Sequence, residues 1–369
     1  MPSTAPAWET YQRHELARAT PVLARLGFVL DVEQPHLLGE RFLMAGERDV
    51  GGGGYKLVLL GSRAHDGRRV VIKASSERNG IREIETERRA RETVRSLPFA
   101  YQTITVPTEL LFTVLDGYRI FITDCIEQER TFISRPLPEQ FALALRALKA
   151  QESIHATTSA HAREVEQIFG SFAAPDYLRS FETFVTNVRR HGLEQDALAQ
   201  TLERARAELA THRETIEQYC GFLTHADFVP HNIRVNDGHV FLLDAASLHF
   251  GNKYESWGRF TNFMLLYNRP LEAALIQYVS DNRTPEEVLS LRLMRIYKLG
   301  KLLEYHVGAA AAASGDVAEL SRTRVTFWLA VLESLLDDKP LDDAVIVRYQ
   351  RDRDLLRSEE EKKRQAALH

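Results

Sequence analysis

The spacing of apolar residues changes near residue 126, and this change limits the fold more than any other feature of the chain. Between residues 27 and 126, short runs rich in Val, Leu and Ile alternate with turn residues, as in "RFLMAG" at residues 41–46, "YKLVLLG" and "RRVVIKAS", which is typical of antiparallel strands. One stretch there, "GIREIETERRARETVRSL", has helical spacing instead. From Pro138 onward nearly every segment has the spacing of a helix, including one long stretch at residues 197–223. The sequence therefore predicts an α+β protein with a sheet-forming N-lobe, which contains one inserted helix, and a mainly helical C-lobe.

The length of the chain also favours two lobes. Its 369 residues exceed the size at which one hydrophobic core usually stops growing. We expect a leading helix in residues 1–26 that packs on or near the N-lobe, an N-lobe in residues 27–126, and a C-lobe in residues 127–369. Pro21 lies within the leading helix and is expected to kink it or to start a second helix.

Composition excludes several classes of protein. The hydrophobic fraction of 44% and charged fraction of 27% are those of an ordinary globular protein, and the net charge of -4 argues against a general nucleic-acid binder. The N-terminus lacks the form of a secretory signal, and no window reaches about 18 uninterrupted apolar residues, so no membrane partner is expected. Cys125 and Cys220 are too few for a disulfide framework and are interpreted as buried thiols in a reducing cytoplasm. Oligomeric state has no signature in the sequence.

The stretch "LTHADFVPHNIRVNDGHVFLLDAAS" places three oxygen-bearing side chains around two short apolar runs. Pro230 prevents a regular helix between Asp227 and Asn232, and the turn "NDGH" predicts a small hairpin that brings Asp244 back towards Asn232. Phosphoryl transfer needs such a set: a carboxylate that orients the attacking hydroxyl, and hard oxygen ligands for Mg²⁺. The alternative is a polar hairpin in which Asp227 caps and Asn232 turns the chain.

This stretch resembles the catalytic and metal-binding core of the aminoglycoside phosphotransferase family, the small-molecule branch of the protein-kinase-like fold. The pattern of that family is His-Gly-Asp, four residues, Asn, and then an Asp after a strand. The resemblance implies that Asp227 is the catalytic base, that Asn232 and Asp244 hold Mg²⁺, and that His225 braces the loop. It extends from about residue 41 to residue 278 and implies the two-lobed protein-kinase-like fold.

The same resemblance gives roles to two N-lobe residues. Lys73 follows three apolar strand residues, the setting in which kinases hold the lysine that contacts nucleotide phosphates. A glutamate of the following helix should pair with Lys73, and we expect Glu87, because it shares a helical stripe with apolar residues. Glu83, one turn earlier, is the alternative. These glutamates also fit ordinary surface pairs with the neighbouring arginines.

Three further segments correspond to parts of the family's site. The consecutive glycines Gly51, Gly52, Gly53 and Gly54 are expected to form a loop over the nucleotide, or else only a flexible turn. The connector "FITDCIEQE" would contact the adenine through backbone groups of Asp124 and Ile126. Glu255 is expected to buttress the catalytic loop, although the family has Asp at the matching position.

The sequence departs from related patterns at further positions. Ala226 replaces the usual Gly, and Val229 stands where protein kinases have a lysine that contacts the transferred phosphate. The predicted activity is therefore that of an ATP- or GTP-dependent phosphotransferase acting on a hydroxyl of a small molecule. A non-catalytic nucleotide-binding pseudokinase is the alternative. Several arginines in the expected acceptor region favour a neutral or anionic metabolite over a cationic aminoglycoside: Arg259, Arg269, Arg283, Arg292 and Arg295.

Overall fold

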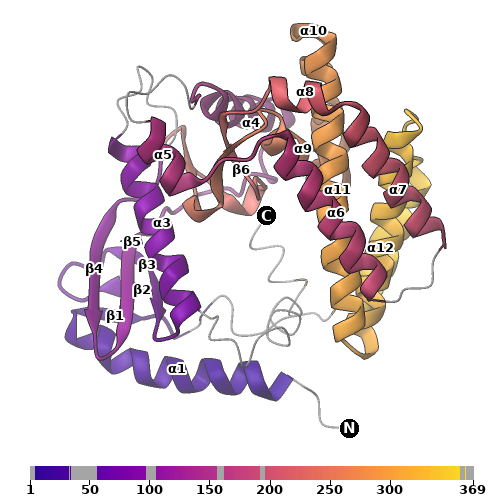
Figure 1. The fold of residues 1–369 in the computed structure, drawn as a ribbon. Coiled ribbons are helices and arrows are strands. Elements are labelled where there is room, and N and C mark those ends of the chain that lie inside the picture. Colours follow the sequence, from indigo (N-terminus) through magenta and orange to yellow (C-terminus); the bar gives the residue numbers. More distant parts are fainter. Residues whose placement is uncertain are drawn as a thin grey trace.

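A computed structural model describes residues 5–32, 34, 56–96, 105–155, 162–191, 196–357 and 362. Figure 1 shows an N-terminal lobe built on a sheet and a C-terminal lobe made mostly of helices. The apolar residues form two separate cores, one in each lobe. The predicted α+β architecture is thus confirmed.

The N-lobe sheet is antiparallel throughout, with strand order β1-β2-β3-β5-β4. Its two final strands are joined at Asp116 and Gly117, which both have positive φ, as the predicted turn requires. The predicted strand at residues 41–46 lies outside the described residues. The strands are β1 Phe28–Leu30, β2 Leu57–Arg63, β3 Arg69–Ser75, β4 Glu109–Leu115 and β5 Tyr118–Asp124.

Helix α3, Arg78–Ser96, is the predicted insertion between β3 and β4. It packs on the sheet and also on the short 3₁₀ helix η3, Ala245–Ser247, of the C-lobe. The side chains of Ile84, Glu87 and Ala90 are buried along one face of α3. The helix therefore connects the N-lobe sheet to the segment that follows Asp244.

Helix α1, Ala5–Arg25, packs against the N-lobe sheet (Figure 1). It contributes Val22 and Leu23 to the N-lobe core, and its Glu15 accepts a hydrogen bond from Tyr118 at 2.6 Å. The helix runs through Pro21 without a break, so the second helix that the sequence suggested there is absent. A proline inside a helix costs about 3 kcal/mol, and burial of the apolar face around it offsets this cost.

The C-lobe is organised around the long central helix α11, which packs against α6, α9 and α12. A capping box between Thr284 and Glu287 fixes the start of α11.

The predicted helix at residues 197–223 is instead two helices, α7 and α8, followed by a strand. The remaining C-lobe helices are α4 Leu137–Glu152, α5 Ala162–Phe169, α6 Ala174–Arg190, α7 Asp196–Thr211, α8 Arg213–Gln218, α9 Glu255–Tyr267, α10 Arg269–Asn282, α11 Pro285–Ala312, α12 Gly315–Leu336 and α13 Asp343–Leu356. No helix among the described residues combines the length and apolarity needed to cross a bilayer.

Two short ladders interrupt the helices and hold the predicted motif. The predicted hairpin is present as β7, Ile233–Asn236, and β8, His239–Leu242. A second pair, β6 Phe222–His225 and β9 Leu248–Gly251, encloses it. The sequence analysis missed this outer pair because each strand has only four residues and its partner lies beyond the hairpin.

Candidate active site

The two ladders bring the three predicted oxygen-bearing residues to one place. Asp227 lies just after β6, and Asn232 closes the 3₁₀ turn η2, Pro230–Asn232. The backbone N–H of Leu243 donates to the carbonyl of Asn232 at 2.8 Å, which sets Asn232 beside Asp244. Asp244 itself is in the left-handed region, with φ 55° and ψ 54°. The hairpin therefore produces the predicted convergence.

Asp227 is held by contacts on both carboxylate oxygens. The side-chain amide of Asn232 donates to the Asp227 backbone carbonyl at 2.8 Å and to Oδ2 at 3.3 Å. Arg259 donates to Oδ1 from Nε at 2.9 Å, and its Nη2 lies 2.8 Å from the same oxygen. Burial opposes ionisation of Asp227, but the adjacent Arg259 guanidinium outweighs it and holds its pKa below the usual range. Asp227 is therefore a carboxylate at neutral pH.

His225 is fully buried and braces the loop, as predicted from the motif. Its Nδ1 accepts the backbone N–H of Asp227 at 3.2 Å, and its Nε2 lies 3.1 Å from the carbonyl oxygens of Leu243 and Asp244. Because Nδ1 is an acceptor, the ring proton lies on Nε2 and is donated to these carbonyls. Burial lowers the pKa of His225, so the ring is neutral. The imidazole thus ties the loop of Asp227 to the segment of Asp244.

The donor set at Asn232 and Asp244 fits a hard cation such as Mg²⁺. The amide nitrogen of Asn232 is used by Asp227, which leaves Oδ1 on the opposite side of the amide. Ser247 donates to Oδ2 of Asp244 at 2.7 Å, which leaves Oδ1 of that carboxylate. Amide and carboxylate oxygens are ligands of the type that Mg²⁺ prefers. No cluster of three His, Cys, Asp or Glu side chains that would suit a metal is found among the described residues.

Lys73 forms its ion pair with Glu87, which the sequence analysis preferred over Glu83. The ammonium of Lys73 contacts both carboxylate oxygens of Glu87. Arg91 lies on the same carboxylate, with Nη2 3.1 Å from Oε1. Burial opposes ionisation of Glu87, but Lys73 and Arg91 outweigh it and lower its pKa to about 2. Glu83 is on the exposed side of α3 and pairs with Lys56 at 3.2 Å.

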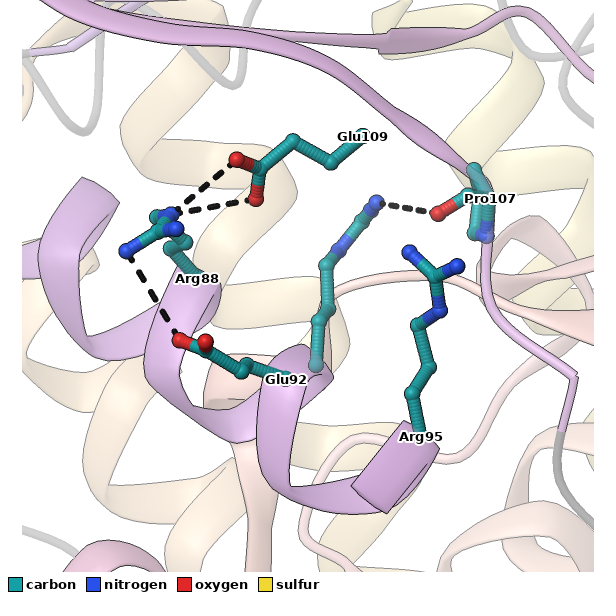
Figure 2. A pocket seen from close by; sticks show the side chains of 6 residues that line it. Arg88, Glu92, Arg95, Pro107 and Glu109 are labelled. Carbon is teal, nitrogen blue, oxygen red and sulfur yellow. Dashed lines mark hydrogen bonds and ion pairs between the residues drawn. The ribbon is translucent and has the colours of Figure 1, made fainter.

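A cavity of about 500 Å³ adjoins this ion pair. Figure 2 shows that Arg88 is paired with two acidic residues of the cavity, Glu109 at 3.0 Å and Glu92 at 3.7 Å. Arg91 donates to the carbonyl of Pro107 at 3.3 Å in addition to contacting Glu87. The lining residues of the cavity are Arg88, Arg91, Glu92, Arg95, Pro107 and Glu109, none of which is a predicted site residue. This region fixes α3 against β4 and so helps to position Glu87.

The other predicted nucleotide contacts are only partly described. The backbone N–H of Asp124 donates to the carbonyl of Thr108 at 3.0 Å, and its side chain pairs with Arg68 at 2.7 Å. The N–H of Asp124 is therefore occupied within the sheet. Ile126 follows β5 and is half-buried. The predicted phosphate loop of Gly51, Gly52, Gly53 and Gly54 lies outside the described residues.

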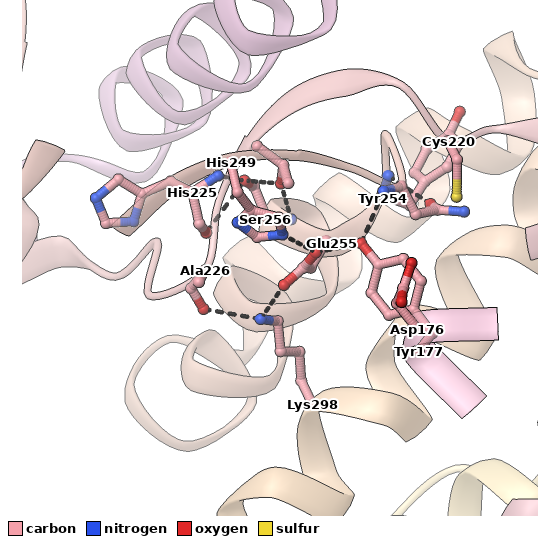
Figure 3. Close-up of polar contacts among 12 residues, drawn as sticks. Asp176, Tyr177, Cys220, His225, Ala226, His249, Tyr254, Glu255, Ser256 and Lys298 are labelled. Atoms are coloured by element: carbon pink, nitrogen blue, oxygen red, sulfur yellow. Dashed lines mark hydrogen bonds and ion pairs between the residues drawn. The ribbon is translucent and has the colours of Figure 1, made fainter. Parts of the chain in front are cut away.

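A buried ion pair supports the loop that contains Asp227 (Figure 3). Lys298 of α11 pairs with Glu255 of α9 and donates to the carbonyl of Ala226 at 2.9 Å. Glu255 also contacts His249 at 2.8 Å and accepts a hydrogen bond from Tyr177. Burial opposes ionisation of Glu255, but His249 and Lys298 outweigh it and hold its pKa below the usual range. Glu255 therefore buttresses the loop through Lys298. The contact of Lys298 with the loop is at Ala226, one residue before Asp227.

The arginines of the expected acceptor region have different partners. Arg259 lies at Asp227, but the other four are engaged elsewhere. Arg269 pairs with Asp343, Arg283 with Glu152, Arg292 with Glu208 and Arg295 with Glu272. The positive charge of this segment is thus largely structural.

The two cysteines are half-buried rather than buried as predicted, since Cys125 lies in the connector and Cys220 just after α8.

Sequence reasoning missed the roles of Arg259 and Lys298. Lys298 left a signal, because it is a single lysine at a position where helical spacing from Leu291 and Met294 predicts a buried apolar residue. The sequence signal at Arg259 is misleading. Arg259 lies four residues after Glu255, which suggests an ordinary pair along the helix, whereas each residue has a different partner.

No protein-family model matches the chain, and no curated protein matches it. Solved structures do match. A thermostable mutant of aminoglycoside phosphotransferase APH(4)-Ia has a TM-score of 0.56 at 15% identity, over 81% of this chain and 98% of that one. Macrolide 2′-phosphotransferase type I has a TM-score of 0.54 at 14% identity, over 85% and 97%. Macrolide 2′-phosphotransferase MphH from Brachybacterium faecium has a TM-score of 0.52 at 17% identity, over 84% and 97%.

These matches confirm the predicted resemblance at the level of the fold. The chain has the two-lobed, protein-kinase-like architecture of aminoglycoside and macrolide phosphotransferases, and the matched region spans both lobes. The matched proteins are small-molecule kinases. At such identities the likeness does not carry over individual residues, so their roles depend on the geometry of the site.

Proposed function

We propose that the chain is a small-molecule kinase that moves the γ-phosphate of ATP or GTP to an alcohol. One observation carries the proposal: Asp227, Asn232 and Asp244 converge on the catalytic hairpin, and η3, which directly follows Asp244, packs against the helix of the Lys73–Glu87 pair. This is the set of charges that phosphoryl transfer from a nucleotide requires. A pseudokinase would not need to retain a charged base beside the metal ligands.

The contacts of the residues support the following roles. Lys73, held by Glu87, binds the phosphates of the nucleotide, and Asn232 and Asp244 would hold a Mg²⁺ that would neutralise them. Asp227 orients the acceptor hydroxyl and takes its proton. His225 and Lys298 keep the loop of Asp227 in place. Because the transition state is largely dissociative, positioning and charge stabilisation supply most of the rate increase.

The matched proteins support the class of substrate but not its identity. APH(4)-Ia has been solved as a ternary complex with ADP and hygromycin B, which supports a nucleotide donor and a small-molecule acceptor. In this chain, Arg259 lies against Asp227 where the acceptor hydroxyl must approach. A cation there disfavours a strongly cationic acceptor. We therefore propose a neutral or anionic alcohol.

The proposal is tested by measuring nucleotide binding and turnover in matched Asp→Asn variants. We expect Mg·ATP or Mg·GTP to bind the intact protein, and turnover on a panel of sugars, polyols and amino alcohols to fall by at least about 1,000-fold in Asp227→Asn. Asp244→Asn should weaken nucleotide binding in the presence of Mg²⁺. Asp237→Asn, in the exposed turn of the same hairpin, is the control and should change neither. If no nucleotide binds the intact protein, the kinase proposal is wrong; binding without turnover on any acceptor favours the pseudokinase.

A further inference from the structure

Arg259 contacts Asp227 directly, and the proposed function gives it no part in the chemical step. The position two residues after Asp227 is Val229, which is completely buried and has no charge to offer a phosphate. We propose that Arg259 replaces the missing cation: it binds the phosphoryl group during transfer and stabilises its charge. This inference rests on the proposed function and adds a catalytic residue to it.

The contacts of Arg259 leave it able to take a second ligand. A guanidinium has five N–H donors, and the contacts to Oδ1 of Asp227 occupy Nε and one edge of Nη2. No other hydrogen bond of Arg259 is found in the described part of the chain. An acceptor oxygen that is hydrogen-bonded to Asp227 lies about 3 Å from the phosphorus it attacks. The remaining N–H groups are therefore within reach of the oxygens of the transferred group.

The position of the guanidinium is fixed by a rigid support. Arg259 projects from α9, and its Cζ lies 6.0 Å from the centroid of the Phe263 ring, one turn further along. Phe263 in turn stacks on Tyr267, with ring centroids 4.3 Å apart and planes 16° apart. A cation over an aromatic face is held in direction as well as in place. The side chain is only 16% exposed, so its charge is poorly screened by water.

The other cations near Asp227 are engaged elsewhere or are not permanently charged. Lys298 is enclosed by Glu255 and the Ala226 carbonyl. His225 is neutral because both ring nitrogens are committed to the backbone. His231 lies 3.9 Å from Oδ2 and is charged only when protonated. Among the described residues, Arg259 is thus the permanent positive charge in contact with Asp227.

The chemical step balances without any proton from Arg259. The hydroxyl oxygen of the acceptor forms a bond to the γ-phosphorus, the bond from that phosphorus to the bridging oxygen breaks, and its electron pair leaves on the nucleoside diphosphate. The hydroxyl proton goes to Oδ2 of Asp227, because Oδ1 has two short contacts from Arg259 whereas Oδ2 accepts only the 3.3 Å contact of Asn232. Arg259 remains charged throughout and donates hydrogen bonds to the phosphoryl oxygens, where charge is spread in the transition state.

The test uses a transition-state analogue, so that the acceptor need not be known. Calorimetry measures the affinity of the intact protein for Mg·ADP alone and with aluminium fluoride, which mimics the planar transferred phosphoryl group. We expect fluoride to tighten binding of Mg·ADP by at least about 100-fold in the unmodified protein. The affinity of Arg259→Gln for Mg·ADP alone should be within about twofold of that of the unmodified protein. Aluminium fluoride should no longer tighten the binding of Mg·ADP by this variant. Arg259→Lys should keep part of the enhancement by fluoride, because the charge is retained.

Arg269→Gln is the matched control, since it removes the same charge from the next helix, where Arg269 pairs with Asp343. It should keep the full enhancement. A full enhancement in Arg259→Gln, or its absence in the unmodified protein although Mg·ADP binds, overturns the role of Arg259. Failure of every form to bind Mg·ADP rejects the proposed function itself. A purely structural role predicts instead that Arg259→Gln lowers stability and leaves the fluoride enhancement unchanged.

Discussion

The two lobes each bury a lysine–glutamate pair, but the pairs differ in what else surrounds them. In the N-lobe, the carboxylate of Glu87 has two cations, Lys73 and Arg91, and Lys73 is 13% exposed. In the C-lobe, the ammonium of Lys298 has two acceptors, Glu255 and the Ala226 carbonyl, and is 2% exposed. The first arrangement leaves a partly accessible lysine for a ligand, whereas the second encloses the lysine and fixes a loop. The same pair of residue types thus has a partly accessible lysine in one lobe, where we propose that it binds the nucleotide, and an enclosed lysine in the other.

The largest effect on stability is expected for Lys298→Met. This change leaves Glu255 buried without its main cation, and breaking a buried pair by removing one partner costs about 3–5 kcal/mol. Urea unfolding measures this loss. Lys301→Met, one turn away on the exposed side of α11, is the control and should change stability by less than about 0.5 kcal/mol. Equal stabilities of the two variants would mean that Lys298 does not support the loop.

A smaller loss of stability and a larger loss of binding are expected for Lys73→Met. Glu87 keeps Arg91 in this variant, so we expect a loss of stability of about 1–2 kcal/mol, below that of Lys298→Met. Affinity for Mg·ATP should fall at least about tenfold, because a phosphate ligand is removed. The comparison between the two pairs is wrong if Lys73→Met binds Mg·ATP normally and unfolds as readily as Lys298→Met.

The smallest effect is a dependence of stability on acid pH. The pKa of Glu87 falls from 4.5 to about 2 on folding, so between these values the unfolded chain binds a proton that the folded chain does not. The stability from Glu87 is therefore complete above pH 4.5 and is lost as the pH falls towards about 2. Urea unfolding of the unmodified protein and Glu87→Gln should show a difference that shrinks over this range. Glu83→Gln, at a carboxylate that is 53% exposed, removes the same charge from the same helix and is the control.

Much of this molecule follows from local patterns in the sequence. Strands at residues 57–63, 69–75, 109–115 and 118–124 have clear apolar runs bounded by turn residues, and the helical spacing of α3 left Glu87 and Glu83 as the two candidate partners of Lys73. The motif around Asp227 predicted that Asn232 and Asp244 would converge, because a hairpin of short strands has a single way to fold back. Local geometry was sufficient in these cases.

Other features depend on contacts that no local pattern contains. Strands β6 and β9 are too short to be identified alone and exist because each pairs with the other. The break between α7 and α8 and the passage of α1 through Pro21 depend on packing against neighbouring elements, which overrides local preference. The predicted acceptor-lining arginines were misjudged for a related reason, because a charge in a helix does not reveal which way it points.

The sequence by itself determined the two-lobed α+β class and the convergence of Asp227, Asn232 and Asp244, because apolar spacing and turn residues act over a few positions. Only the tertiary structure decided which charges meet. Arg259 reaches Asp227 across 32 positions, and Lys298 reaches Ala226 across 72. A buried charge must find a partner, but which partner it finds depends on how α9 and α11 pack beneath the loop. That packing sets the support and the electrostatics of the site.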